Sequence, residues 1–101
     1  MPQWVIIAYD GTDAGAPARR QAVRPAHLAN VAPMVESGAL KAGGAILDDN
    51  GTMIGSVTIA DMPDRAALDH WLATDPYVTG LVWQTIEVQP FRLAVLAKSA
   101  G

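Results

Sequence analysis

The chain has 101 residues, half of them apolar, and its formal net charge is −3 at pH 7. This length and apolar content predict a single domain, residues 1–101, built around a hydrophobic core. The acidic balance argues against a nucleic-acid-binding surface, since phosphate contacts need clustered lysine and arginine, and the only cluster, Arg19, Arg20 and Arg24, is too small. The lack of cysteine excludes disulfides, thiolate catalysis and cysteine-based metal sites.

The first predicted element is a strand over residues 4–9. These residues are continuously apolar, β-branched or aromatic, and they run into the turn signal of residues 10–13. The run predicts a strand that is buried on both faces. It is short and no basic region precedes it, so we expect neither a signal peptide nor a membrane span, and we expect a cytoplasmic protein.

A helical pattern follows from beyond Pro17 to Gly38, where glycine predicts a left-handed helix stop. Four residues recur at the i, i+3, i+4, i+7 spacing of one buried face: Leu28, Val31, Ala32 and Val35. Pro25 predicts a kink or a helix start just ahead of His27, and Pro33 predicts a kink inside the pattern.

Two strands come next. Residues 39–47 have the composition of a strand, and the glycine pair at 43–44 indicates a bulge or the close approach of a backbone or ligand. Residues 48–51 end in Asn-Gly, a signal for a two-residue hairpin turn. The partner strand is predicted over residues 53–60.

A second helix is expected from about Pro63, with Asp61 as its cap. Its predicted buried face contains Ala67, Leu68, Trp71 and Leu72. The helix must end by residues 74–76, because a residue before proline is pushed away from the α region.

A last strand is predicted from about residue 82 to 88, with Val82, Ile86 and Val88 on one face. Pro90 interrupts this strand, and residues 91–96 are expected to continue as an edge or tail strand. A flexible tail is expected from about residue 97 to the end.

The resulting order, β-α-β-β-α-β, predicts an α+β, ferredoxin-like fold with a four-stranded antiparallel sheet. Two helices cover only one face of such a sheet, and the other face would leave a large apolar surface in water. We therefore expect a homodimer that packs sheet to sheet, with a cleft for a small-molecule ligand between the sheet and the helices.

His27 is the leading candidate for acid–base chemistry. Only two histidines are present, and histidine is the side chain that titrates near neutral pH. His27 follows Arg24 and Pro25, whereas His70 precedes Trp71 on the second helix and is expected at the surface. The ordinary alternative is a histidine that flanks a packed helix face.

Several segments together resemble the YciI-like (YCII-related) family, over nearly the whole chain. They are RPAHL at residues 24–28, Gly38, AGG at 42–44, GS at 55–56, DPY at 75–77 and VQPF at 88–91. The resemblance implies a dimeric α+β barrel with a catalytic histidine–aspartate pair, here His27 and Asp75, beside a pocket. One branch of the family is similar to a dehydrochlorinase that acts on a hydroxylated ring, and the wider fold group holds muconolactone isomerases and cofactor-free oxygenases.

A carboxylate on one imidazole nitrogen fixes the tautomer and leaves the other nitrogen free to move a proton. No serine or threonine stands out as a nucleophile, so elimination, dehydrochlorination or isomerisation is favoured over acyl transfer. Asp75 followed by Pro76 is also an ordinary helix start, with aspartate as N-cap and proline at N1. Both roles of Asp75 remain open at this point.

Arg24, Ser56 and Tyr9 are the candidate substrate-binding residues. Arg24 suits a carboxylate or phenolate, with a solvated surface charge as its ordinary role. Ser56 is a small hydroxyl in a strand, and Tyr9 ends the first strand where a pocket would open, with core packing as the alternative. We expect no metal and no other cofactor, because no carboxylate lies at helical ligand spacing from His27.

Three functions are therefore compatible with the sequence. The leading one is a lyase or isomerase that acts on a small, aromatic or lactone-like organic anion. The others are a non-catalytic module that binds a small ligand and a cofactor-free oxygenase.

Overall fold

The computed structural model describes residues 1–97, so most of the tail expected from residue 97 lies outside the described residues. The elements in chain order are β1 (Gln3–Asp10), α1 (Ala16–Ser37), β2 (Leu40–Leu47), β3 (Met53–Asp61), α2 (Arg65–Thr74), α3 (Pro76–Thr79) and β4 (Trp83–Phe91). Among the described residues, no helix has both the length and the hydropathy needed to cross a membrane.

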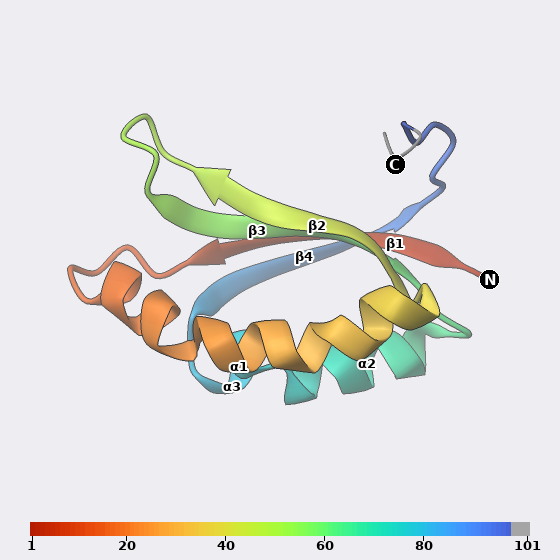
Figure 1. Cartoon of the computed structure of the whole chain (residues 1–101), viewed down its shortest axis with the longest axis horizontal. Helices are drawn as coiled ribbons and strands as arrows, with labels where there is room; N and C mark the ends of the chain where they lie inside the picture. Colours follow the sequence, from red (N-terminus) through yellow and green to blue (C-terminus); the bar gives the residue numbers. More distant parts are fainter. Residues whose placement is uncertain (98–101) are drawn as a thin grey trace.

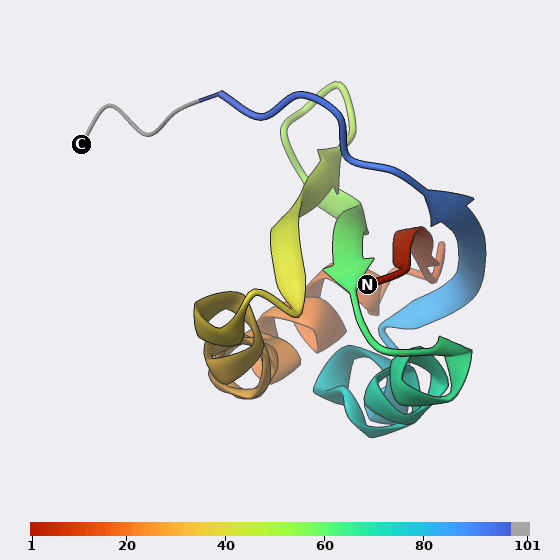
Figure 2. The same ribbon diagram turned by 90° about the vertical axis from the view of Figure 1, so that its right-hand side faces the viewer.

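The four strands form one antiparallel sheet in the order β2-β3-β1-β4. All three helices lie on the same face of this sheet, with α1 beside β2 and with α2 and α3 towards β4 (Figure 1, Figure 2). The predicted α+β, ferredoxin-like fold is confirmed. The short helix α3 begins at Pro76, where Asp75 and Pro76 predicted a helix start.

Strand β1 shows how the sheet divides its residues between the two faces. Trp4, Ile6 and Ala8 are buried against the helices, because successive side chains of a strand point to opposite faces. Val5 and Ile7 point to the open face and are half-buried. The prediction that this strand is buried on both faces is therefore wrong for the single chain, in which only the helix-facing side is buried.

Helix α1 begins at Ala16 and remains helical through Pro25 and Pro33. The predicted helix start at Pro25 is wrong, because Gly15 ends the preceding turn and Pro17 lies in the first helical turn, where proline is well tolerated. Gly38 ends the helix with a φ of 86°, a conformation that favours glycine, so the predicted stop is confirmed.

The predicted buried face of α1 is wrong. Leu28 is 45% exposed and Val35 is 58% exposed, whereas Ala16 and Arg20 are the buried residues of this helix. Leu28, Val31 and Val35 line a cavity between α1 and the sheet, whereas Ala32 is exposed and does not line it. Helical spacing therefore identified three of the four residues on this face correctly and predicted their packing incorrectly.

The turns are built by aspartate side chains. The β2–β3 hairpin is confirmed, and the Asp48 carboxylate accepts hydrogen bonds from the backbone N–H groups of Asn50 and Thr52. Its loop covers residues 48–52, so it is longer than a two-residue turn. Helix α2 is capped by Asp64, whose carboxylate accepts from the backbone N–H of Ala67, and the prediction of Asp61 as the cap is wrong.

Strand β4 continues through Pro90 to Phe91, and residues 92–97 form no strand. The predicted interruption is wrong because β4 is an edge strand, in which a missing N–H can face solvent. The hydrophobic core lies between the sheet and the α2–α3 side of the helix layer. Its largest members are Trp4, Ile6, Leu40, Met62, Leu68, Trp71, Tyr77 and Trp83.

Candidate active site

Asp75 lies at the junction of α2 and α3 and is completely buried. Its side chain accepts a hydrogen bond of 2.9 Å from the backbone N–H of Tyr77, so it caps α3 as an N-cap aspartate does. Pro76 occupies the first turn of α3, where its missing N–H costs nothing. The role of Asp75 as a helix N-cap, one of the two considered from the sequence, is therefore present.

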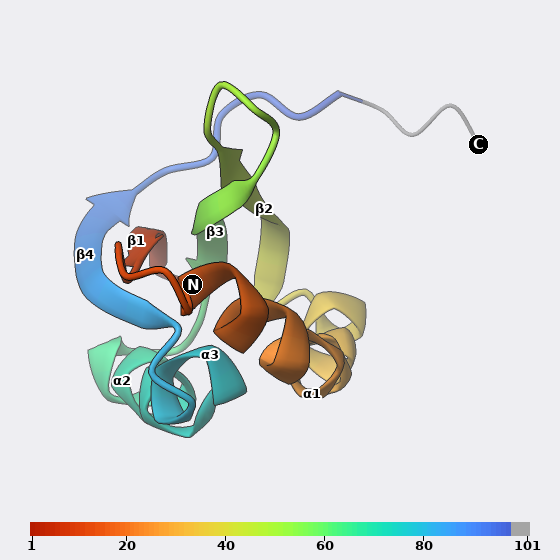
Figure 3. The same cartoon turned by 90° about the vertical axis from the view of Figure 1, so that its left-hand side faces the viewer.

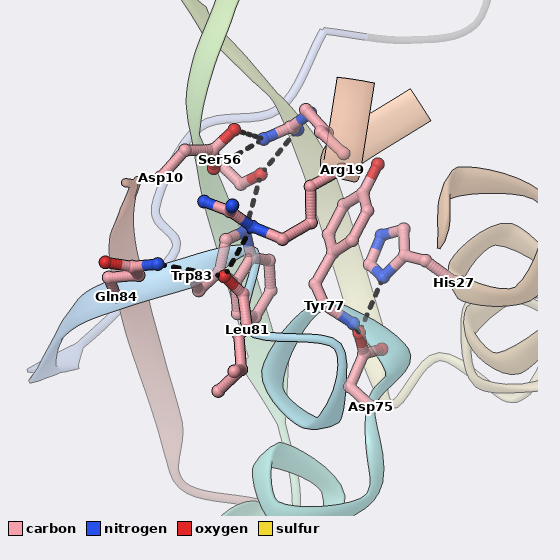
Figure 4. Close-up of polar contacts among 10 residues, drawn as sticks. Asp10, Arg19, His27, Ser56, Asp75, Tyr77, Leu81, Trp83 and Gln84 are labelled. Carbon is pink, nitrogen blue, oxygen red and sulfur yellow. Dashed lines mark hydrogen bonds and ion pairs between the residues drawn. The ribbon is translucent and has the colours of Figure 1, made fainter. Parts of the chain in front are cut away.

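The same carboxylate also contacts His27. His27 Nδ1 lies 2.8 Å from Asp75 Oδ1, although the two residues are 48 positions apart in the chain (Figure 4). A carboxylate only accepts hydrogen bonds, so we assign the hydrogen to Nδ1 of His27. The other ring nitrogen, Nε2, then carries a free lone pair.

Close packing of α3 against α1 sets this distance. A side chain on Gly80 would lie 2.7 Å from the Pro76 carbonyl oxygen and 3.0 Å from a methyl group of Val23 on α1. Glycine at this position therefore lets the two helices approach. Their approach brings Asp75 to His27.

Asn30 is a third member of the group that the sequence analysis did not predict. Its side-chain N–H₂ donates to Asp75 Oδ2 at 3.1 Å. Asn30 lies three residues after His27 on α1, so both side chains reach the same carboxylate from one helix face. The i, i+3 spacing from His27 was the available signal.

Tyr77 packs flat against the His27 ring. The ring centroids are 3.8 Å apart and the planes differ by 11°. On the Tyr77 ring also lies the Arg20 guanidinium, whose central carbon is 4.7 Å from the ring centroid. Burial raises the pKa of the Tyr77 phenol, so the hydroxyl stays protonated at neutral pH.

Arg20 belongs to a buried polar network beneath this stack. It forms an ion pair of 2.9 Å with Asp10, and both side chains are 4% exposed. Its second terminal nitrogen donates to the hydroxyl of Ser56, which also accepts a hydrogen bond of 3.2 Å from the indole N–H of Trp83. The network fixes Arg20 and links α1 to the sheet. Sequence reasoning saw Arg20 only as part of a small basic cluster.

A cavity of about 340 Å³ lies between α1 and the β2–β3 side of the sheet. Its wall includes His27, Arg24, Arg20, Ser56 and Tyr77. Arg24 has no ion-pair partner within residues 1–97, so its charge is available to a ligand. His27 is only 15% exposed, which limits its contact with bulk water.

The predicted site residues therefore have different positions. His27, Arg24 and Ser56 line one cavity, and Asp75 lies directly behind His27. Tyr9 is 47% exposed, on the open face of the sheet, so its alternative role in the core is wrong. It lines a separate hollow beside Thr12 and Thr85, and the structure does not bring it to the His27 cavity. His70 is exposed, as predicted.

A four-stranded antiparallel sheet with helices on one face, and with a ligand-sized cavity between the layers, defines a ferredoxin-like α+β protein. The sequence matches the profile of the YCII-related domain over residues 2–92. The chain belongs to this family, and the resemblance noted from its motifs is confirmed.

One curated relative supports the family, and one solved structure supports the fold. The chain is 34% identical over 95 residues to the protein YciI of Escherichia coli O6:H1, covering 88% of this chain and 95% of that protein. Its fold is similar to that of the 5-chloro-2-hydroxyhydroquinone dehydrochlorinase of Burkholderia phenoliruptrix AC1100, solved in complex with 2,5-dihydroxybenzoquinone. That similarity has a TM-score of 0.78 at 21% identity and covers 91% of this chain and 95% of the other.

A dimeric ferredoxin-like protein of Jannaschia sp. CCS1 is a more distant structural neighbour. It has a TM-score of 0.52 at 18% identity and covers 92% of this chain and 100% of the other. At this level of identity the likeness concerns the fold alone.

Proposed function

We propose that this protein is a small cytosolic enzyme in which His27 acts as general acid and base on a small organic anion. The observation that carries the proposal is the 2.8 Å contact between His27 and a fully buried Asp75 at the wall of a cavity. A buried carboxylate that holds one imidazole nitrogen leaves the other for proton transfer, and a positioned acid–base group contributes rate factors of about 10²–10⁴.

The roles of the two residues follow from their exposure. Asp75 is 0% exposed and its two oxygens accept from His27, Asn30 and the Tyr77 N–H, so it has no route to a ligand. Asp75 therefore orients His27, and His27 faces the ligand. Arg24 supplies the positive charge that attracts an anionic substrate into the cavity.

The surroundings favour elimination, dehydrochlorination or isomerisation over acyl transfer. Ser56 is the serine on the cavity wall that could serve as a nucleophile, but its oxygen already accepts hydrogen bonds from Arg20 and Trp83. A Ser56 oxygen that accepts from two donors is a poor nucleophile, since no base within residues 1–97 accepts a hydrogen bond from its hydroxyl. The substrate class we propose, an aromatic or lactone-like anion, is supported by the ligand of the dehydrochlorinase with the similar fold.

A substrate panel with matched variants tests this proposal. Chlorinated hydroxyhydroquinones and muconolactone-type lactones are incubated with the protein, and products are followed by proton NMR. We expect turnover of at least one compound, and a decrease in kcat of about 10²–10⁴ in His27→Gln and in Asp75→Asn. His70→Gln, which changes the exposed histidine, is the control and keeps full activity.

Nitrogen-15 NMR of the imidazoles adds a readout that needs no substrate. In the unchanged protein, His27 should hold its hydrogen on Nδ1, and Asp75→Asn should shift the tautomer towards Nε2. Ligand binding without turnover, together with unchanged binding in His27→Gln, would instead support a binding module. Consumption of dioxygen during turnover would support a cofactor-free oxygenase.

We also propose a homodimer that packs through the open face of the sheet. Val57 and Phe91 are 36% and 38% exposed on this face, beside the half-buried Val5, Ile7 and Ile59. Light scattering over a dilution series should give about twice the chain mass, and Val57→Glu at the centre of the face should reduce it towards one chain. A single-chain mass at every concentration would contradict the dimer.

A further inference from the structure

The cavity beside His27 continues along α1 well past the acid–base group. The helix residues that line it are Arg20, Arg24, His27, Leu28, Val31 and Val35. From His27 to Val35 the helix rises by about 12 Å, at 1.5 Å per residue. The charged and hydrogen-bonding side chains lie at the Arg20 end, and the wall beyond His27 is aliphatic on the helix side.

The volume of the cavity exceeds what a single ring requires. It measures about 340 Å³, whereas a cavity of roughly 150 Å³ is enough to bind benzene. Gly43 on β2 leaves part of this space open, since a methyl group there would meet only Thr58 and the Val57 carbonyl, at ordinary contact distances of 3.5 Å and more. Packing therefore does not require glycine at this position, and its missing side chain widens the cavity.

The exposure of the aliphatic wall indicates what fills it. Leu28 and Val35 remain 45% and 58% exposed although both face the cavity. The free energy of the complex is lowered when an apolar group of a ligand covers apolar side chains on a cavity wall. Arg24, which has no ion-pair partner within residues 1–97, lies at the other end of the same space.

We propose that the natural ligand is an amphiphilic anion, with an acidic head group at Arg24 and His27 and an apolar tail along Leu28, Val31 and Val35. This inference rests on the proposed function, because it places the reacting head of the substrate beside His27. It adds a tail of about eight carbons, which matches the rise of about 12 Å along the helix. The substrate class is therefore an alkyl-bearing aromatic or aliphatic acid, larger than a bare ring.

A series of tail lengths tests this inference. Binding of benzoate, para-butylbenzoate and para-octylbenzoate is measured by calorimetry, below the concentrations at which they form micelles. We expect the affinity to rise roughly threefold to fourfold for each methylene that becomes buried. A constant affinity across the series would overturn the inference.

Two matched variants locate the tail. Val35→Glu places a charge at the far end of the cavity and should remove the gain from the octyl chain while leaving benzoate binding unchanged. Ala32→Glu adds the same charge at an exposed position of α1 that does not line the cavity, and should preserve the gain. NMR shows where para-octylbenzoate binds. If adding it changes the chemical shifts of Val57 and Ile7 on the open face, and not those of Val31 and Val35, the inference is also overturned.

The two proposals fail in different ways. If benzoate binds and His27-dependent turnover is present but tail length has no effect, the tail is wrong and the proposed function stands. If affinity rises with tail length and Arg24→Gln weakens binding, but no compound is turned over or His27→Gln leaves turnover unchanged, the amphiphilic ligand stands and the proposed function is wrong.

Discussion

The two sides of the helix layer use the same face of the sheet in different ways. Helices α2 and α3 lie towards β4, and α1 lies towards β2 (Figure 3). On the α2–α3 side, Leu68, Trp71 and Tyr77 are at most 4% exposed and form the core with residues of β1 and β4. On the other side, only two residues of the 22-residue helix α1 are buried. One half of the layer stabilises the fold, and the other half encloses the candidate active site.

The strands beneath the helices explain this difference. β1 and β4 direct Trp4, Ile6 and Trp83 towards the helices, and these large side chains fill the space below α2 and α3. β2 directs Gly43 and Ala45 to the same layer, as their pairing with Thr58 and Ser56 shows. Small residues under α1 leave a cavity. The His27–Asp75 pair lies at the boundary between the two halves of the helix layer.

The largest effect we expect is on the packed side. Trp71 is 4% exposed and its ring meets that of Trp83 edge to face at a centroid distance of 6.4 Å. Trp71→Ala should therefore lower the free energy of unfolding by about 3–5 kcal/mol, as large core truncations do. Urea denaturation followed by far-ultraviolet circular dichroism measures this change.

Leu28→Ala on α1 is the matched comparison. Leu28 is 45% exposed beside the cavity, so the same kind of truncation should cost less than about 1 kcal/mol. Equal losses for the two variants would mean that the α1 side is packed as tightly as the α2–α3 side. The contrast between the two halves would then be wrong.

Sequence reasoning recovered the fold because most elements carry local signals. Residues 4–9 had the composition of a strand, Gly38 stopped a helix, and Asp75 preceded a proline. The burial of α1 was not predictable in the same way. Periodicity shows which face of a helix is apolar, but the distance between that face and the sheet depends on the side chains of β2, which no helical pattern contains.

The candidate site was predicted in part, for a related reason. His27 was named from its place in the sequence and Asp75 from the family resemblance, and Asp75 both caps α3 and contacts His27. The ion pair of Arg20 with Asp10 was not foreseen, since arginine is seldom buried and Arg20, next to Arg19, looks like a surface charge in the sequence. Only the fold brings its partner near.

A smaller effect is expected at Leu81, which follows α3 on the packed side. Leu81 has a φ of 59° and is 67% exposed, so it adopts a left-handed conformation that strains a side chain with a Cβ atom. Its N–H donates to the carbonyl of Val78, and the next N–H donates to that of Tyr77, as in a glycine-type helix end. Leu81→Gly should therefore raise the free energy of unfolding by roughly 0.5–1 kcal/mol.

Leu81→Ala separates the two contributions to that change. Alanine removes the exposed aliphatic group but keeps the Cβ atom, so it should leave stability nearly unaltered. Thermal denaturation of the unchanged protein, Leu81→Gly and Leu81→Ala measures the two contributions. If glycine and alanine have the same effect, backbone strain at this position is not the cause, and the packed side stores no strain there.

The smallest effect concerns the polar contact that fixes the first turn of α1 to the α3–β4 turn. Arg19 donates to both carboxylate oxygens of Asp13, at 2.9 and 3.1 Å. It also donates to the carbonyl of Leu81 at 3.1 Å (Figure 4). The hydrogen bonds from Arg19 lower the pKa of the Asp13 carboxyl below its usual value. The pair is a surface contact, since the Asp13 side chain is 55% exposed, so its contribution is small and is screened by salt.

The direction of the pH dependence follows from the lowered pKa. The folded state binds the Asp13 proton more weakly than the unfolded state, so the contact stabilises the fold above the unfolded pKa, about 4. This stabilisation decreases as the pH falls below about 4 and disappears once the folded carboxyl is protonated. Asp13→Asn should accordingly lower the melting temperature slightly at pH 7 and in low salt, and the difference from the unchanged protein should vanish in acid and at high salt.

Asp49→Asn, at an exposed position of the β2–β3 loop, serves as the control, and its melting temperature should follow that of the unchanged protein at every pH. A difference for Asp13→Asn that persists at low pH would show that the Asp13 charge has no part in joining α1 to the packed side.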